Sequence, residues 1–219
     1  MILKFYSSID NNLLTKKKII LKSISFYIVS QMVVMLSIGI FYFALKFLNI
    51  DPYLFYPHSI KNIVPDKWYL IIFIGPVIEE IAFRLGISFN KKDLVISLPV
   101  LCFILLSAAL GGYSSQVVLK CIISLCLFIF LIALPQDFSV RYASKFGKQT
   151  VVGLVFLFGF LHLFNFDISV RYLPVYIFLC SPQIVMGITF SYLRLNAGFI
   201  YAIGAHIIVN CISMFFQII

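Results

Sequence analysis

The chain has 219 residues, of which 62% are hydrophobic and only 11% charged, and its mean hydropathy is +1.07. A soluble domain carries about 25% charged residues, so this composition excludes a water-soluble globular protein, and the 24 phenylalanines and 12 tyrosines exclude an intrinsically disordered one. The net charge of +9 comes from basic residues spread over many short segments, which argues against a nucleic-acid-binding protein. We therefore expect a multi-pass membrane protein.

Continuous apolar runs of roughly 20 residues are typical of transmembrane helices. The sequence predicts an all-α transmembrane bundle of seven spanning helices, at residues 23–48, 68–89, 94–110, 117–134, 150–166, 172–195 and 197–218. Residues 1–22 are expected to be a cytosolic N-terminal segment, because no small-residue cleavage site follows the first apolar run. Residues 23–219 are expected to form one membrane domain.

The distribution of lysine and arginine predicts the orientation of these helices. With the N-terminus inside the cell, the inner segments hold eleven basic residues and the outer segments and span ends hold five. The inner set is Lys4, Lys16, Lys17, Lys18, Lys22, Lys91, Lys92, Arg141, Lys145, Lys148 and Arg194, and the outer set is Lys46, Lys61, Lys67, Lys120 and Arg171. This bias predicts a cytoplasmic N-terminus in the cell membrane, with the lipid bilayer as a partner and the excess charge facing anionic inner-leaflet lipid.

Ionisable side chains gather inside the predicted spans. The whole chain contains two glutamates, Glu79 and Glu80, and both fall near the middle of the second span, together with Arg84. His162 and His206 fall within the fifth and seventh spans. A charged side chain at the bilayer centre costs about 2.5–3.5 kcal/mol on insertion scales, so such residues usually face the protein interior and carry a function.

The spacing of the second-span residues separates the two glutamates. Glu80 and Arg84 are four positions apart on one helical face, which predicts an ion pair that supports the structure. Glu79 is rotated by about 100° from Glu80 and is therefore left for chemistry. Pro76 removes one backbone hydrogen bond and is expected to kink the helix beside this site.

Two further pairs share the four-residue spacing, His206 with Asn210 and Phe158 with His162. Polar faces on three separate spans can converge in one buried pocket. There a glutamate can act as general base toward water, a histidine can hold that water, and a histidine with an amide can donate hydrogen bonds to an oxyanion. This combination favours hydrolysis of a carbonyl-centred bond.

The same residues resemble the CPBP intramembrane proteases, the family that includes CAAX prenyl endopeptidases and bacteriocin-processing or abortive-infection-type proteins. The family's motifs EExxxR, FxxxH and HxxxN stand here as EEIAFR at 79–84, FGFLH at 158–162 and HIIVN at 206–210. All three occur in order, each within a predicted span, and the matched region covers residues 68–213.

The resemblance implies a glutamate-dependent membrane endopeptidase that cuts a hydrophobic or membrane-anchored peptide or protein. It assigns Glu79 as the catalytic base, His162 as its assistant, and His206 with Asn210 as the oxyanion pair. Glu80, Arg84 and Phe158 would support the site. No cofactor is expected.

Three alternatives remain on the sequence alone. One glutamate and two histidines would also satisfy zinc, which makes a zinc-dependent form of the same hydrolase the nearest rival, less favoured because HExxH is absent. A membrane immunity protein acting by binding would need no general base. A transporter or proton relay would use the same buried charges, although no inverted repeat is evident.

Overall fold

The structure is a computed structural model that describes residues 13–55, 68–110 and 114–218. The described residues form helices and no strands, which confirms the predicted all-α class. The longer helices are α1 (Leu13–Phe47), α4 (Lys91–Leu110), α5 (Ser114–Ala133), α6 (Phe138–Leu161), α8 (Ser181–Asn196) and α9 (Phe199–Ile218). The shorter segments are η2 (Pro52–Phe55), η4 (Leu70–Ile74), α3 (Gly75–Glu80), η5 (Ile81–Leu85), η6 (Gly86–Ser88), η7 (His162–Asn165), η8 (Val170–Tyr172) and α7 (Leu173–Leu179).

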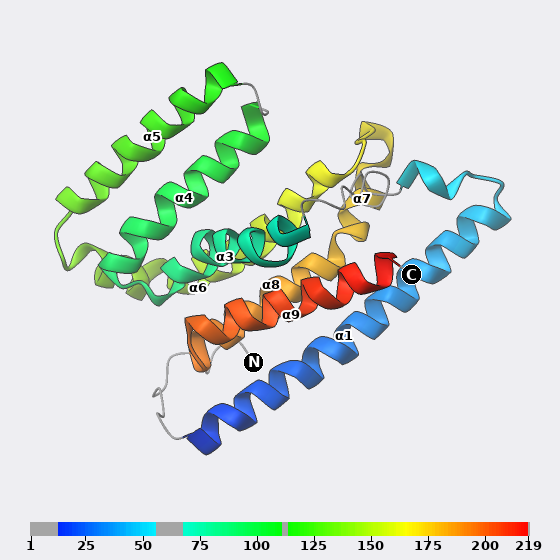
Figure 1. The fold of residues 1–219 in the computed structure, drawn as a ribbon, viewed down its shortest axis with the longest axis horizontal. Coiled ribbons are helices and arrows are strands. Elements are labelled where there is room, and N and C mark those ends of the chain that lie inside the picture. The colour runs from blue at the N-terminus through cyan, green and yellow to red at the C-terminus, as the bar shows by residue number, and fades with distance from the viewer. Residues whose placement is uncertain (1–12, 56–67, 111–113, 219) are drawn as a thin grey trace.

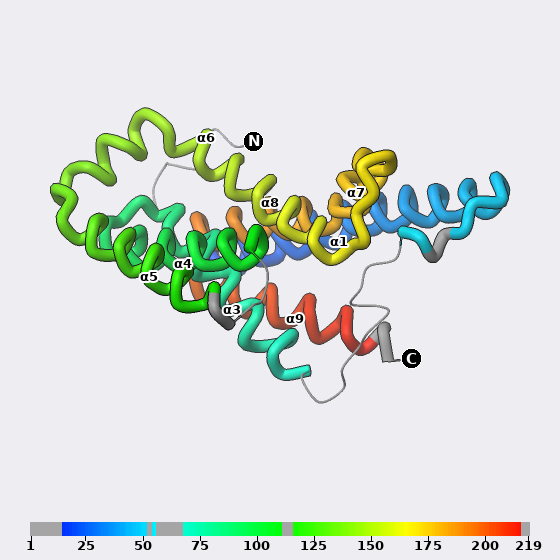
Figure 2. The backbone as a smooth tube through the Cα atoms, turned by 90° about the horizontal axis from the view of Figure 1, so that it is seen from above, coloured from blue at the N-terminus to red at the C-terminus, as the bar shows by residue number. Residues whose placement is uncertain are grey.

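The helices are arranged around α8. Helix α8 packs against α1, α6 and α9, while α4 packs against α5 on one side and against η5 on the other. Figure 1 shows α1 along one edge of the molecule and the α4–α5 hairpin at the opposite edge. In the perpendicular view, α3 and α9 lie together on one side of the molecule (Figure 2). The segment that carries the two glutamates is therefore enclosed by α4, α8 and α9.

Among the residues that the structure describes, four helices are long and apolar enough to cross a membrane, namely Thr15–Phe47, Lys91–Leu110, Gln116–Ala133 and Phe138–Asn165. Residues Val170–Leu179 and Ser181–Asn196 make a fifth crossing if this pair, bent by 42°, is counted as one span. Large hydrophobic side chains are exposed along these helices, for example on α1 and α5. Exposed apolar faces of this kind suit contact with lipid, so these are the helices of a membrane-embedded protein.

The observed helices differ from the seven predicted spans in their continuity and their ends. The second predicted span is a chain of short segments with different winding, and the sixth is broken at Cys180, beside Pro182 in the first turn of α8. Helix α1 begins at Leu13 and α6 at Phe138, where the sequence predicted Ser23 and Thr150. In both cases the helix continues through a basic stretch that hydropathy alone places outside the membrane. Residues 13–22 of the predicted N-terminal segment thus belong to α1, and residues 1–12 lie outside the described ranges.

Two glycines let α6 and α8 approach closely beside the site. A Cβ at Gly159 would lie 2.4 Å from Cγ1 of Ile184, and a Cβ at Gly187 would lie 3.3 Å from Cγ1 of Val155. Side chains at these positions would separate the helices, since interiors are packed without spare space. The close crossing brings Phe158 of α6 into a buried cluster with Phe83 of η5.

Candidate active site

The two glutamates end a short α-helix that lies between two π-helical turns. The π-turn η4 precedes α3, and the π-turn η5 follows it directly after Glu80. Pro76 occupies the first turn of α3, where its missing N–H costs least, and the winding changes there from π to α. Single π-turns inside helices occur frequently at functional sites.

One of the two glutamates is sealed inside the protein. The side chains of Glu80 and Arg84 are 0% and 1% exposed, and Nη1 of Arg84 lies 3.2 Å from Oε1 of Glu80. The predicted ion pair is therefore present. The Arg84 guanidinium also lies over the ring of Phe158, with Cζ 3.8 Å from the ring centroid. An opposite charge and an aromatic face thus compensate the buried cation.

His206 of α9 joins the two glutamates. Its Nδ1 donates a hydrogen bond to Oε1 of Glu80 at 2.9 Å, and its Nε2 lies 3.7 Å from Oε2 of Glu79, which is too long for a hydrogen bond. The imidazole is buried, and the ring of Phe190 lies 4.9 Å away between centroids. His206 is therefore held by both carboxylates and by an aromatic ring of α8.

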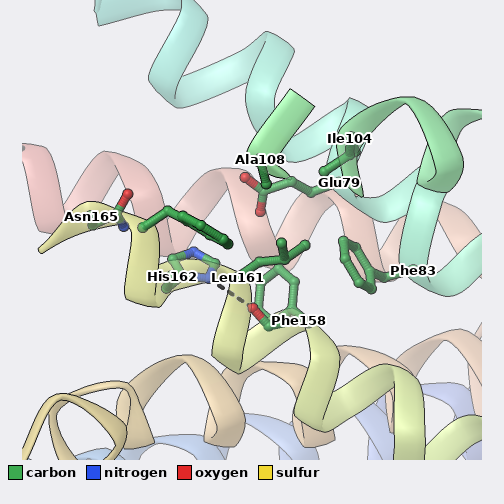
Figure 3. Close-up of a pocket in the computed structure, with 9 residues that line it drawn as sticks. Glu79, Phe83, Ile104, Ala108, Phe158, Leu161, His162 and Asn165 are labelled. Carbon is green, nitrogen blue, oxygen red and sulfur yellow. Dashed lines mark hydrogen bonds between the residues drawn. The ribbon is translucent and has the colours of Figure 1, made fainter. Parts of the chain in front are cut away.

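Glu79 faces a cavity. Its side chain is 34% exposed, in contrast to the neighbouring Glu80. The cavity has a volume of about 350 Å³ and is lined by Glu79, Phe83, Ile104, Ala108, Phe158, Leu161, His162, Phe164 and Asn165. Figure 3 shows Glu79 reaching this cavity from α3 and His162 reaching it from the end of α6. A carboxylate and an imidazole thus share a space that is otherwise mostly apolar.

The tautomer of His162 follows from its backbone contact. Nδ1 lies 2.9 Å from the carbonyl oxygen of Phe158, and a carbonyl can only accept, so Nδ1 carries the proton. When the ring is neutral, Nε2 is then its lone-pair nitrogen. The same ring lies edge-on to Phe158, with the centroids 4.9 Å apart. These contacts give His162 one orientation and leave one acceptor nitrogen for a water or a substrate.

The residues predicted as the oxyanion pair make other contacts in the structure, and their catalytic role stays a prediction. The side-chain amide of Asn210 donates to the carbonyl of Ile71 in the π-turn η4, at 2.9 Å. Neither Asn210 nor His206 is among the described residues that line the cavity. Asn165 lines it instead, and its position three residues after His162 is a sequence signal that could have identified it. The contributions of Ile104 and Ala108 from α4 had no such signal.

The positions of the possible metal-ligating side chains can be compared with the zinc-dependent alternative. Within residues 13–55, 68–110 and 114–218, no three side chains of His, Cys, Asp or Glu are placed to hold a metal ion together. Glu79 and His206 approach one another, while His162 is engaged with the Phe158 carbonyl. The site holds a carboxylate and imidazoles, which are groups that can transfer protons.

No protein-family model, no curated protein and no solved structure matches this chain. The function is therefore inferred from the fold and from the geometry of this site.

Proposed function

We propose that the chain is an intramembrane glutamic endopeptidase of the CPBP type, in which Glu79 activates a water molecule to hydrolyse a peptide bond of a hydrophobic or membrane-anchored polypeptide. The contrast between the two adjacent glutamates carries this proposal. Glu80 is sealed and neutralised by Arg84, whereas Glu79 borders a cavity that also contains His162. A carboxylate kept accessible inside an apolar protein is suited to general-base catalysis.

The reaction would proceed in two proton-transfer steps. Glu79 accepts a proton from water as the water oxygen bonds to the scissile carbonyl carbon, and Nε2 of His162 accepts the second hydrogen bond of that water. The resulting tetrahedral intermediate carries an oxyanion, to which the cavity-lining amide of Asn165 can donate. Protonated Glu79 then gives its proton to the leaving nitrogen, the C–N bond breaks, and an acid and an amine are released.

We propose for His206 a role that differs from the one that the family resemblance implies. Its Nδ1 proton is engaged by Glu80, and its Nε2 faces Glu79 rather than the cavity. We propose that His206 orients Glu79, which its Nε2 approaches to 3.7 Å. Asn210 is proposed to fix the π-turn η4 ahead of the glutamates through Ile71.

The full topology is part of the same proposal. The protein would cross the cell membrane seven times, with its N-terminus in the cytoplasm. The crossings would be made by α1, the segment 68–89, α4, α5, α6, the bent pair α7–α8, and α9. The positive-inside bias supports this orientation. Segment 68–89 and α9 lie together beside the glutamates, so they would cross as a protein-packed pair.

The test compares peptides and new protein termini in membranes that contain wild-type protein or Glu79→Gln at matched levels. Products found only with wild type support a peptidase and identify its substrate. The matched control is Asp137→Asn, because Asp137 is 63% exposed and is not among the residues that line the cavity. This control should leave the products unchanged.

Two other results would replace the proposal. Identical products and an identical phenotype with folded Glu79→Gln would favour an immunity protein that acts by binding. A solute flux in vesicles that is driven by a pH gradient and abolished by Glu79→Gln would favour a transporter.

A further inference from the structure

Arg194 lies in the last turn of α8, and its side chain reaches the end of the glutamate-bearing segment. Its Nε donates to the carbonyl of Arg84 at 3.1 Å, and its Nη2 donates to the carbonyl of Leu85 at 3.3 Å. The same Nη2 lies 2.9 Å from Oδ2 of Asp93, in the first turn of α4. One guanidinium thus connects three helical segments, and it is only 15% exposed.

The two carbonyls lie near the end of their helical segment, and the Leu85 carbonyl is also within 3.3 Å of the Ser88 hydroxyl. The π-turn η5 ends at Leu85, η6 follows, and Phe89 stops the segment with φ of 55°. The last carbonyls of a helix have no donor further along the same helix. The fork of an arginine can serve two acceptors at once and still meet a carboxylate, which a lysine ammonium cannot do with the same geometry.

Asp93 is fixed as well. The hydroxyl of Ser88 donates to Oδ2 of Asp93 at 2.6 Å, so this oxygen accepts from both Ser88 and Arg194. Ser88 itself belongs to η6. The acidic partner of Arg194 is therefore tied to the same segment end that Arg194 contacts.

The same face of α8 also contacts the side-chain end of Arg84. Phe190 precedes Arg194 by four residues, and its ring centroid lies 5.8 Å from Cζ of Arg84 and 4.9 Å from the His206 ring. Helix α8 thus contacts the side chain of Arg84 through Phe190 and its backbone through Arg194. Since Arg84 pairs with Glu80, the position of this backbone also sets where the two glutamates point.

We propose that Arg194 is a positioning residue: by binding the Arg84 and Leu85 carbonyls, with Asp93 as its counter-ion, it fixes the rotation of segment 75–85 so that Glu80 meets His206 and Glu79 faces the cavity. The effect of Arg194 on turnover rests on the proposed peptidase function. Its effect on the positions of Glu79 and Glu80 does not depend on that function.

The experiment uses the full-length chain in micelles or nanodiscs and four variants. Arg194→Gln removes the fork, Arg194→Lys keeps the charge without the fork, and Asp93→Asn removes the counter-ion. Arg141→Gln is the matched control, because Arg141 pairs with Asp137 at 3.0 Å while 70% exposed. The first readout is the ¹⁵N spectrum of labelled histidine, which is simple because the chain has three histidines and His206→Gln assigns one of them. The second is kcat and KM on the substrate found above.

We expect Arg194→Gln to shift the His206 resonances and to lower kcat by about tenfold to a hundredfold with KM nearly unchanged. Arg194→Lys should resemble Arg194→Gln, Asp93→Asn should have a smaller effect, and Arg141→Gln should have none. If Arg194→Gln does not fold, Arg194→Lys and Asp93→Asn decide by the same readouts. An unchanged His206 spectrum, or a shifted spectrum with unchanged kcat, would overturn the proposal. A shifted spectrum in a protein that cleaves nothing would leave the positioning intact and remove the peptidase.

Discussion

His206 donates its Nδ1 proton to the carboxylate of Glu80 across 126 residues of chain, at 2.9 Å. Glu80 in turn pairs with Arg84, whose guanidinium lies on the ring of Phe158. The three sequence motifs are therefore joined by buried contacts, with Glu80 at their centre. Charge-assisted hydrogen bonds in such surroundings are stronger than neutral ones, so the network ties α3, α6 and α9 together.

Replacing Glu80 should mainly affect stability, whereas replacing Glu79 should mainly affect cleavage. Glu80→Gln is expected to lower the free energy of unfolding by about 3–5 kcal/mol, because it leaves Arg84 buried without its counter-ion. Glu79→Gln should change it by less than about 1 kcal/mol, since Glu79 is partly exposed, while abolishing cleavage. Unfolding in detergent measures the first effect and product formation the second. Equal destabilisation by the two variants would contradict the assigned roles.

Replacing Asn165 and replacing Asn210 should affect different properties of the protein. Asn165→Ala is expected to lower kcat by about 10²–10³-fold, the usual cost of one oxyanion donor. Asn210→Ala should mainly cost about 1–3 kcal/mol of stability, because it leaves the carbonyl of Ile71 without its donor. Steady-state kinetics and unfolding on both variants test this. The reverse pattern would restore Asn210 to the catalytic role that the family resemblance implies.

The close crossing of α6 and α8 predicts a contrast between two glycines of α6. Gly159→Ala should destabilise the protein by about 1–3 kcal/mol, because the new methyl group would overlap Ile184. Gly153→Ala should be neutral or stabilising by up to about 1 kcal/mol, since nothing lies within 4 Å of a Cβ there. Adding Ile184→Ala to Gly159→Ala should recover part of the loss, as expected for side chains in contact. Thermal unfolding of the four proteins measures these differences.

Cleavage should survive metal removal. The proposed reaction uses the carboxylate of Glu79 and the imidazole of His162. Incubating purified protein with a strong chelator should leave product formation unchanged. Activity that is lost on chelation and returns on adding zinc would instead support the zinc-dependent form of the hydrolase.

The sequence predicted those features that depend on neighbours along the chain. The apolar runs indicated the helices, and the spacing of Glu80 and Arg84 indicated their ion pair, because both belong to one helical stretch. The predicted starts of α1 and α6 were wrong, because basic residues precede the apolar runs. Hydropathy indicates where a segment enters the apolar part of the membrane, whereas helical hydrogen bonding extends beyond that point.

The partners of the long-range polar side chains could not be predicted in the same way. His206 and Asn210 share a helical face, yet one meets Glu80 and the other meets the backbone of Ile71. Which partner each finds depends on the winding of the segment opposite them. The π-turns that set this winding have no distinct sequence pattern in this apolar run.

The two π-turns determine where this segment can change in length. A π-turn closes its hydrogen bond over one residue more than an α-turn, so each contains one residue that an ordinary helix would lack. Removing a residue from Leu70–Ile74 would restore an α-turn and leave the direction of the glutamates unaltered. Removing one from Gly75–Glu80 would rotate the chain by about 100° and bring a different side chain to the cavity. Deletions should therefore be tolerated in η4 and not in α3.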